Sequence, residues 1–284
     1  MAIKKVGVVG CGLMGRGIVE VSAKAGYEVV ASEINQQLLD QGLAALNASL
    51  TKAVERGKAT QEEKDATISR IKGTTSMEDF KDCDLVIEAA VENIDLKKKI
   101  FADLDRICPK HAILGTNTSC LSILDIAMAT KRPEKVLGMH FFNPVPVMRG
   151  LELVETIVTS EEVVKAADEF GKSVGKSVFK CGDAPGFIVN RLLMPYMLEA
   201  MRILEAGFAS KEDIDKGIVL GLNYPMGPFP LADYVGLDTL YFVACAIYEE
   251  FKDPRYAPPT LLKKMVTAGH LGRKAGKGFY DYSK

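Results

Sequence analysis

The chain has 284 residues, of which 48% are hydrophobic and 26% charged, a balance typical of a globular protein with one large or two medium domains. Its formal net charge of -1 gives no general basic surface for nucleic acid. No stretch of about 18 apolar residues occurs, so we expect no transmembrane helix and no membrane partner.

The chain begins with a predicted strand and a glycine-rich turn. Residues 3–9 form a short β-branched run, and "GCGLMG" follows, in which Gly10, Gly12 and Gly15 match the pattern GxGxxG. In dinucleotide-binding folds the first glycine permits the turn, the second lets a pyrophosphate approach the backbone, and the third lets helix and strand pack closely. A helical pattern comes next, so we expect phosphate to bind at its N-terminus.

A second strand is predicted over residues 27–33 and ends at an acid, Glu33. This acid follows the third glycine by 18 residues, a spacing that suits a carboxylate accepting hydrogen bonds from the adenine ribose. A carboxylate there repels a 2′-phosphate, and the next residues supply no arginine, so the sequence favours NAD over NADP. Leu13 and Met14, inside the glycine motif, would also contact the cofactor.

A longer helical segment is predicted over residues 36–66. Within it Lys52, Arg56 and Lys58 lie close together in the sequence. Such a charge run is usually a solvated helix face. The alternative is a patch that binds a phosphorylated substrate tail, and spacing alone leaves both readings open.

Further strands are predicted near residue 70 and from residues 84, 112 and 135, separated by helical or polar segments. This alternation predicts an α/β domain with a mostly parallel, doubly wound sheet. Ligands bind beyond the carboxyl ends of strands in such sheets. Polar groups gather there and we expect them to converge on one crevice: Glu88, Glu92, Asn117, Ser119, His140 and Asn143.

From residue 186 the pattern becomes helical. Residues 186–207 predict one long helix with Pro195 inside it, and three more helices follow. The cluster of Gly, Asp and Pro over residues 180–187 predicts a linker. We therefore expect a Rossmann-like domain over residues 1–184 and an all-α domain over residues 185–284.

A dehydrogenase that oxidises an alcohol needs a general base, and histidine is the usual choice. His111 precedes a predicted strand and so lies at the edge opposite the crevice, and His270 lies in a Gly- and Lys-rich segment. His140 lies at the carboxyl end of a predicted strand, in "GMHFFNPVPV", and is the favoured base. On the next strand Glu152 and Glu155 face opposite sides, and either could orient the imidazole.

The whole chain resembles the L-3-hydroxyacyl-CoA dehydrogenase family, and most closely its standalone bacterial 3-hydroxybutyryl-CoA members. The resemblance rests on these stretches: "VGVVGCGLMGRGI", "VENIDLKKKIF", "TNTSCLSI", "GMHFFNPVPVM", "DAPGFIVNRLL", "PMGPFPLADYVGLDT" and "AGHLGRKAGKGFYDYS". It implies a reversible, NAD-dependent oxidation of (S)-3-hydroxyacyl-CoA to 3-oxoacyl-CoA, and a homodimer formed through the helical domain.

The resemblance also implies roles for single residues. The partner carboxylate stands twelve residues after the catalytic histidine, which selects Glu152, while Ser119 and Asn190 lie at the substrate and nicotinamide. Further positions match family contacts to the cofactor: Glu92, Lys97, Ser119, Asn143 and Lys274. Ser49 and Arg56 match positions that contact CoA, and the family usually has lysine where Arg56 stands.

Three positions depart from the family pattern without removing a catalytic group. Cys120 replaces a common serine, Glu33 stands where aspartate is commoner, and Gly150 interrupts an aliphatic run before Glu152, which could loosen that strand. Two other functions stay open: a related dehydrogenase of another hydroxy substrate, such as a sugar acid, or a non-catalytic NAD-binding protein.

The cysteines show no CxxC motif and no Cys/His ligand spacing. We therefore expect reduced thiols in a cytoplasmic protein and no metal site. The six cysteines are Cys11, Cys83, Cys108, Cys120, Cys181 and Cys245.

Overall fold

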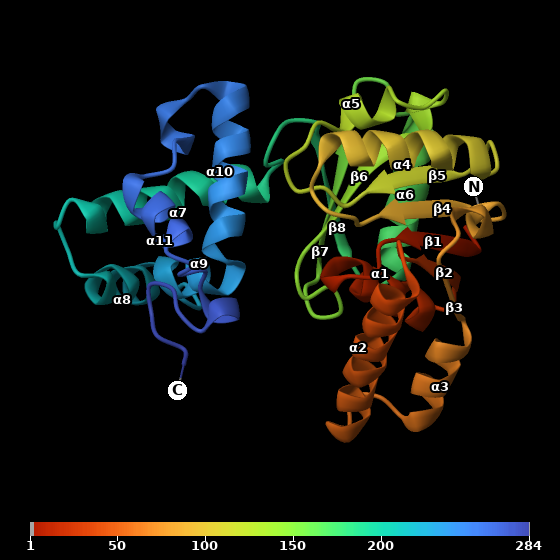
Figure 1. Cartoon of the computed structure of the whole chain (residues 1–284), viewed down its shortest axis with the longest axis horizontal. Coiled ribbons are helices and arrows are strands. Elements are labelled where there is room, and N and C mark those ends of the chain that lie inside the picture. Colours follow the sequence, from red (N-terminus) through yellow and green to blue (C-terminus); the bar gives the residue numbers. More distant parts are fainter. Residues whose placement is uncertain (1–2, 284) are drawn as a thin grey trace. The chain divides into compact units, whose positions relative to one another are not determined.

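The structure, a computed structural model, describes residues 3–283, and the chain divides into two compact units, Met1–Asp183 and Ala184–Lys284. The first is a twisted sheet with helices on both faces, and the second is helical (Figure 1). The predicted fold class, a mostly parallel Rossmann-like sheet followed by an all-α unit, is confirmed.

The sheet of the first unit has eight strands in the described part of the chain, in the order β3-β2-β1-β4-β5-β6-β7-β8 (Figure 1). The strands are β1 (Lys5–Val9), β2 (Glu28–Ser32), β3 (Ile71–Thr74), β4 (Leu85–Glu88), β5 (Ile113–Thr116), β6 (Val136–Phe141), β7 (Gly150–Glu155) and β8 (Ser177–Gly182). All neighbours pair in parallel except β6 and β7, which are antiparallel. The strand order reverses beside β1, so the crevice expected for a ligand lies outside the carboxyl ends of β1 and β4.

Six α-helices accompany the sheet within the described residues: α1 (Leu13–Lys24), α2 (Gln36–Glu55), α3 (Gln61–Ser69), α4 (Ile94–Ile107), α5 (Ile123–Ala127) and α6 (Glu161–Ser173). Two short 3₁₀ turns also occur, η1 (Met77–Phe80) and η2 (Pro133–Lys135). Helices α2 and α3 extend away from the sheet as an arm (Figure 1), where the sequence predicts a helical segment over residues 36–66. A capping box between Thr60 and Glu63 starts α3.

The alternation of side chains along β6 and β7 assigns their two faces. Met139 and Leu153 point into the main apolar core, which α1, α2 and α6 also line. On the other face Gly138 leaves room for Ile123 of α5, because a Cβ at Gly138 would lie 2.4 Å from that side chain. Since the side-chain period of a strand is two residues, His140 shares the α5 side with Gly138.

Two details of the first unit differ from the sequence expectation. The segment predicted as a linker is partly a strand, because β8 continues to Gly182 and pairs in parallel with β7. Gly150 does not interrupt its strand but begins it. A Cβ there would lie 3.3 Å from the rings of both Phe142 and Phe179, so the glycine leaves space for that aromatic pair.

The second unit contains α7 (Val189–Glu205), α8 (Lys211–Leu222), α9 (Pro228–Val235), α10 (Leu237–Phe251) and α11 (Thr260–Thr267), with the 3₁₀ turns η3 (Pro254–Tyr256) and η4 (Arg273–Ala275). The predicted long helix is confirmed by α7, with Pro195 inside it. Ser210 caps α8 by accepting a hydrogen bond from the Asp213 amide at 3.1 Å.

Two buried aspartates fasten the C-terminal segment of this unit. Asp233 accepts hydrogen bonds from the amides of Phe279 (2.8 Å) and Tyr280 (2.9 Å) and from the Tyr282 hydroxyl (3.1 Å). Asp215 accepts one from the Tyr280 hydroxyl. Neither aspartate exposes more than 9% of its surface, so each carboxylate replaces its lost water with protein donors.

Residues 3–283 also bear on membrane and metal binding. There, no single helix is long and apolar enough to cross a membrane, although α9 and α10, bent by 93°, reach the required length and composition as a pair. The same residues contain no group of three or more His, Cys, Asp or Glu side chains placed to hold a metal ion. All six cysteines are free thiols.

Candidate active site

The turn between β1 and α1 has the geometry of a phosphate cradle. Gly10 adopts φ +91°, a region that favours glycine, and a Cβ at Gly15 would lie 1.8 Å from the Gly10 carbonyl oxygen. Gly12 begins the helix with no side-chain cap, and a Cβ there would meet nothing within 4 Å. The uncapped amides of the first turn are therefore open to an anion, and these residues fit NAD.

Glu33 follows β2 and reaches back to this turn. One carboxylate oxygen accepts a hydrogen bond from the Cys11 amide at 2.8 Å, and the other accepts one from the Ile34 amide at 3.1 Å. A carboxylate has about four lone-pair sites, so both oxygens keep capacity for ribose hydroxyls. Burial, followed by the charge of Glu33, raises the pKa of the Cys11 thiol to about 11, which keeps this thiol neutral beside the turn.

His140 and Glu152 stand directly opposite each other in the antiparallel pair of β6 and β7. The distance from His140 Nδ1 to Glu152 Oε2 is 2.6 Å, and the two residues are 5% and 0% exposed. Glu155 lies three residues on, faces the opposite side of the sheet and is exposed. Strand register thus selects Glu152, which the resemblance alone had indicated.

The pair has the arrangement of an oriented base. A carboxylate bound to one ring nitrogen fixes the imidazole and stabilises its charged form, and the second nitrogen is then directed elsewhere. The ring also packs against Phe142, with centroids 4.7 Å apart. Such a pair can move a proton to or from a hydroxyl group held at Nε2.

A second buried network lies at the ends of β4 and β5. Glu88, which is fully buried, binds the Lys97 ammonium at 2.6 Å and the Thr116 hydroxyl at 2.7 Å. Lys97 is 1% exposed and also lies 3.4 Å from Glu92. Glu92 in turn accepts a hydrogen bond from the Ser119 amide at 2.8 Å. The network therefore holds the backbone of Ser119.

Asn117 connects this loop to the strand that carries His140. Its backbone amide donates to the Glu88 carbonyl at 2.7 Å, and its side-chain oxygen accepts from the Phe141 amide at 2.9 Å. The loop after β5 is thereby attached to β6 at the residue that follows His140. Of the predicted crevice residues, the structure thus brings Glu88, Glu92, Asn117 and Ser119 into one hydrogen-bonded set joined to β6.

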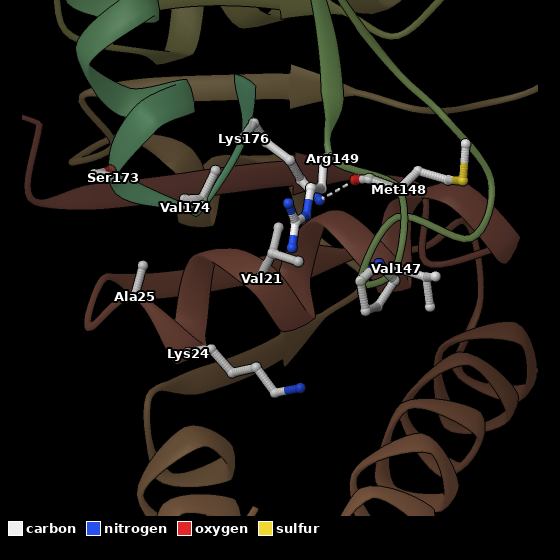
Figure 2. Close-up of a pocket in the computed structure, with 11 residues that line it drawn as sticks. Val21, Lys24, Ala25, Val147, Met148, Arg149, Ser173, Val174 and Lys176 are labelled. Carbon is white, nitrogen blue, oxygen red and sulfur yellow. Dashed lines mark hydrogen bonds between the residues drawn. The ribbon is translucent and has the colours of Figure 1, made fainter. Parts of the chain in front are cut away.

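A pocket of about 420 Å³ lies between α1, α2 and the segment after β6. It brings together three of the predicted contact residues, Leu13, Ser49 and Asn143. Residues 143–147 form one wall of this pocket. Lys176, which is 8% exposed, supports this segment by donating hydrogen bonds to the carbonyls of Val145 and Met148. Figure 2 shows the bond to Met148 in a neighbouring pocket, which Lys176 itself lines.

Other predicted residues lie outside these clusters. Arg56 is exposed at the C-terminal end of α2. Within the helical unit Asn190 lies in the first turn of α7, and Lys274 pairs with Asp238 at 2.6 Å. His111 is exposed and lies 3.0 Å from Asp84, which precedes β4, so its predicted place at the opposite edge is confirmed.

Sequence reasoning missed the supporting roles of Thr118 and Lys176. Thr118 is 1% exposed and donates its hydroxyl to Glu92 at 2.5 Å. The sequence did offer a sign of this role, because Thr118 stands in a run of polar residues directly after a predicted strand. Lys176 gave no signal, because only the fold shows that its ammonium is buried.

Each unit matches a model of the same protein family, and the whole chain matches known dehydrogenases. Residues 5–184 match the family model described as "3-hydroxyacyl-CoA dehydrogenase, NAD binding domain", and residues 186–282 match "3-hydroxyacyl-CoA dehydrogenase, C-terminal domain". A 3-hydroxybutyryl-CoA dehydrogenase of Mycobacterium tuberculosis is 51% identical over 99% of both chains. One of Clostridioides difficile is 46% identical over 99% of this chain and 100% of its own.

A solved structure gives the same result in three dimensions. The crystal structure of (S)-3-hydroxybutyryl-CoA dehydrogenase from Ralstonia eutropha superposes with a TM-score of 0.96 at 45% identity, covering both chains completely. The resemblance found in the sequence therefore extends over both units.

Proposed function

The chain belongs to the 3-hydroxyacyl-CoA dehydrogenase family, and from this premise we propose that it catalyses the reversible, NAD-dependent oxidation of (S)-3-hydroxyacyl-CoA to 3-oxoacyl-CoA. We propose short-chain substrates of the 3-hydroxybutyryl-CoA type, because the relatives described above carry that name. The observation that carries the proposal is the 2.6 Å contact between His140 and Glu152 at the carboxyl edge of the sheet.

His140 is the general base in this proposal. It accepts the proton of the C3 hydroxyl at Nε2, while Glu152 holds Nδ1 and stabilises the imidazolium that forms. Bound NAD supplies the hydride acceptor for C3. In the reducing direction His140 begins protonated and donates its proton to the oxygen of the 3-keto group.

Ser119 orients the acyl segment, and Asn190 of the helical unit contributes to the same task. Support for Ser119 is the hydrogen bond from its backbone amide to Glu92, which holds the backbone of this residue in the loop after β5. For Lys97 a direct cofactor contact stays a prediction. What supports a role is its ion pair with Glu88 and its approach to Glu92, through which it would position both Glu92 and Ser119.

The cofactor and the CoA moiety contact the remaining predicted residues. Backbone groups from Gly10 to Gly15 and the Glu33 carboxylate hold the pyrophosphate and the adenine ribose, Asn143 and Lys274 give further cofactor contacts, and Ser49 and Arg56 bind CoA. Support for these roles comes from the open first turn of α1 and from the pocket that Ser49 shares with Asn143. Residues 1–184 would thus bind NAD, and residues 185–284 would serve substrate binding and dimerisation.

The test is an assay in which the protein is mixed with acetoacetyl-CoA and either NADH or NADPH, and oxidation of the reduced cofactor is followed as loss of absorbance at 340 nm. We expect rapid oxidation of NADH and slow oxidation of NADPH, because Glu33 repels a 2′-phosphate. Rapid loss with NADPH alone would keep the reaction and overturn the role of Glu33. No loss with either, in folded protein, would reject the function and favour another hydroxy substrate or a non-catalytic role.

The same proposal includes a cytoplasmic homodimer joined through the helical unit. Support comes from large apolar side chains that this unit exposes on α7, α8 and the turn between them: Leu192, Phe208, Leu220 and Leu222. Sedimentation equilibrium should give a mass near twice the 30.9 kDa of the chain. A mass of one chain at micromolar concentration would refute the dimer.

A further inference from the structure

Arg16 is a cationic residue with no role in the reaction proposed above. It is the fourth residue of α1 and lies on the wall of the 420 Å³ pocket described above. One turn further along α1, Glu20 lines the same pocket, but its carboxylate is bound to Lys24 at 2.6 Å. Among residues 3–283, no acidic side chain lies within ion-pair distance of Arg16.

The opposite wall of the pocket is formed by α2, with apolar residues at positions 45, 46 and 48 and polar residues at Ser49 and Lys52. Ser49 and Lys52 both line the pocket, and Arg56 follows on the same helix. These positions are spaced i, i+3 and i+7, so they lie on one face of the helix. Arg16 thus lies across the pocket from one further cation, Lys52, while Arg56 lies beyond the lining at the C-cap of α2. The only carboxylate of the pocket lining, Glu20, is already paired with Lys24.

We propose that Arg16 is an additional substrate-binding residue, which binds a phosphate group of the CoA moiety across the pocket from Ser49 and Lys52. An unpaired guanidinium in a partly buried pocket suits a phosphate, which it binds through two parallel N–H···O bonds. This inference rests on the proposed function, since it names which side chain recognises the carrier of the acyl group.

The pyrophosphate of the dinucleotide is the competing anion. Its place is the uncapped first turn of α1, on the side of Gly12 and of Glu33 at the end of β2. Arg16 instead shares its pocket with Ser49 and Lys52 of the helical arm, although Leu13 and Asn143, proposed above as cofactor contacts, also line it. The polar residues of the arm favour the acyl-CoA as the ligand of Arg16, and the KM for NADH, measured below, separates the two anions.

The first test compares steady-state kinetics of Arg16→Gln and Arg16→Lys with two substrates, acetoacetyl-CoA and acetoacetyl-pantetheine, which lacks every phosphate. For Arg16→Gln we expect KM for acetoacetyl-CoA to rise about tenfold, the usual loss for a hydrogen bond to a charged group. The KM for acetoacetyl-pantetheine and for NADH should stay within about twofold of wild type. Arg16→Lys should recover part of the loss, because it keeps the charge without the planar fork.

Arg106→Gln is the matched control. Arg106 is an exposed arginine of α4 whose ion pairs, within the described residues, are with Glu78 and Asp103 on the surface, so its removal should change no KM. An equal rise in KM for both acyl substrates in Arg16→Gln, a rise for NADH, or no change at all would each overturn the inference.

Titration calorimetry with free CoA keeps the inference separate from the proposed activity. We expect wild type to bind CoA and Arg16→Gln to bind it about tenfold more weakly, whether or not the protein turns over acetoacetyl-CoA. Failure of wild type to oxidise NADH would reject the proposed function alone. Equal affinity of both proteins for CoA, or no binding by wild type, would reject the role of Arg16.

Discussion

The two units of this molecule both bury carboxylates, but the partners of these carboxylates differ. In the sheet unit Glu152 is paired with a histidine and Glu88 with a lysine, both near the carboxyl ends of strands, which is the edge where ligands generally bind in sheets of this kind. In the helical unit Asp233 and Asp215 meet backbone amides and tyrosine hydroxyls of the C-terminal segment. Burial of a charge alone therefore does not mark a catalytic site, and the chemistry and place of the partner decide.

We therefore expect variants of the His140–Glu152 pair in the sheet unit to lose activity, and variants of Asp233 or Asp215 in the helical unit to change in stability. The largest effect should come from His140→Ala, which removes the proton acceptor. We expect kcat to fall about 10²-fold or more, the scale of general acid–base catalysis, with little change in the affinity for NADH. A kcat within a few-fold of wild type would remove His140 from the mechanism.

Glu152→Gln should have the next largest effect. The amide keeps the shape of the side chain but does not stabilise the imidazolium, so we expect kcat to fall at least about tenfold with little change in KM. Glu155→Gln is the matched control on the same strand, because its side chain is exposed on the opposite face. If Glu155→Gln lowered kcat more than Glu152→Gln did, Glu152 would not be the carboxylate that assists His140.

Asp233→Asn tests the structural kind of buried carboxylate. The amide group leaves at least one of its three donors poorly matched, so we expect the free energy of unfolding in urea to fall by about 1–3 kcal/mol. Asp281→Asn, an exposed change in the same segment, should leave the urea midpoint unchanged. A loss of kcat in folded Asp233→Asn, with unchanged stability, would contradict the division drawn between the two units.

The smallest expected effect is a pH dependence at Asp215. Burial raises the pKa of this carboxyl, although hydrogen bonds from Tyr280 and Phe229 act against that rise. Because the native state holds the proton more tightly than the unfolded chain, this group's contribution to stability falls as pH rises from about 3.9 towards the raised pKa.

Asp215→Asn removes that dependence. Its stability relative to wild type should therefore be more favourable at pH 7 than at pH 4, as measured by urea unfolding at both values. A difference between the two proteins that stays constant with pH would mean that Asp215 has an ordinary pKa in the native state.

Much of the fold and part of the site could be read from the sequence, for physical reasons. The glycine motif, the acid at the end of β2 and the strand that carries His140 each depend on residues that are close in the sequence. Such features can be recognised without knowledge of the fold. The choice between Glu152 and Glu155 is not local, because it depends on the register in which β7 pairs with β6. The Glu88–Lys97 pair and the Lys176 contact were beyond sequence reasoning for the same reason, since burial of an ammonium depends on tertiary packing.

Chemical rescue of His140→Ala would show whether His140 itself transfers the proton. Imidazole and its substituted derivatives would be added to His140→Ala in the assay of NADH oxidation with acetoacetyl-CoA. We predict that they restore the rate in a saturable way, with a pH dependence that follows the pKa of the added base. No rescue, in a variant that still binds NADH and CoA as wild type does, would mean that His140 is not the group that transfers the proton.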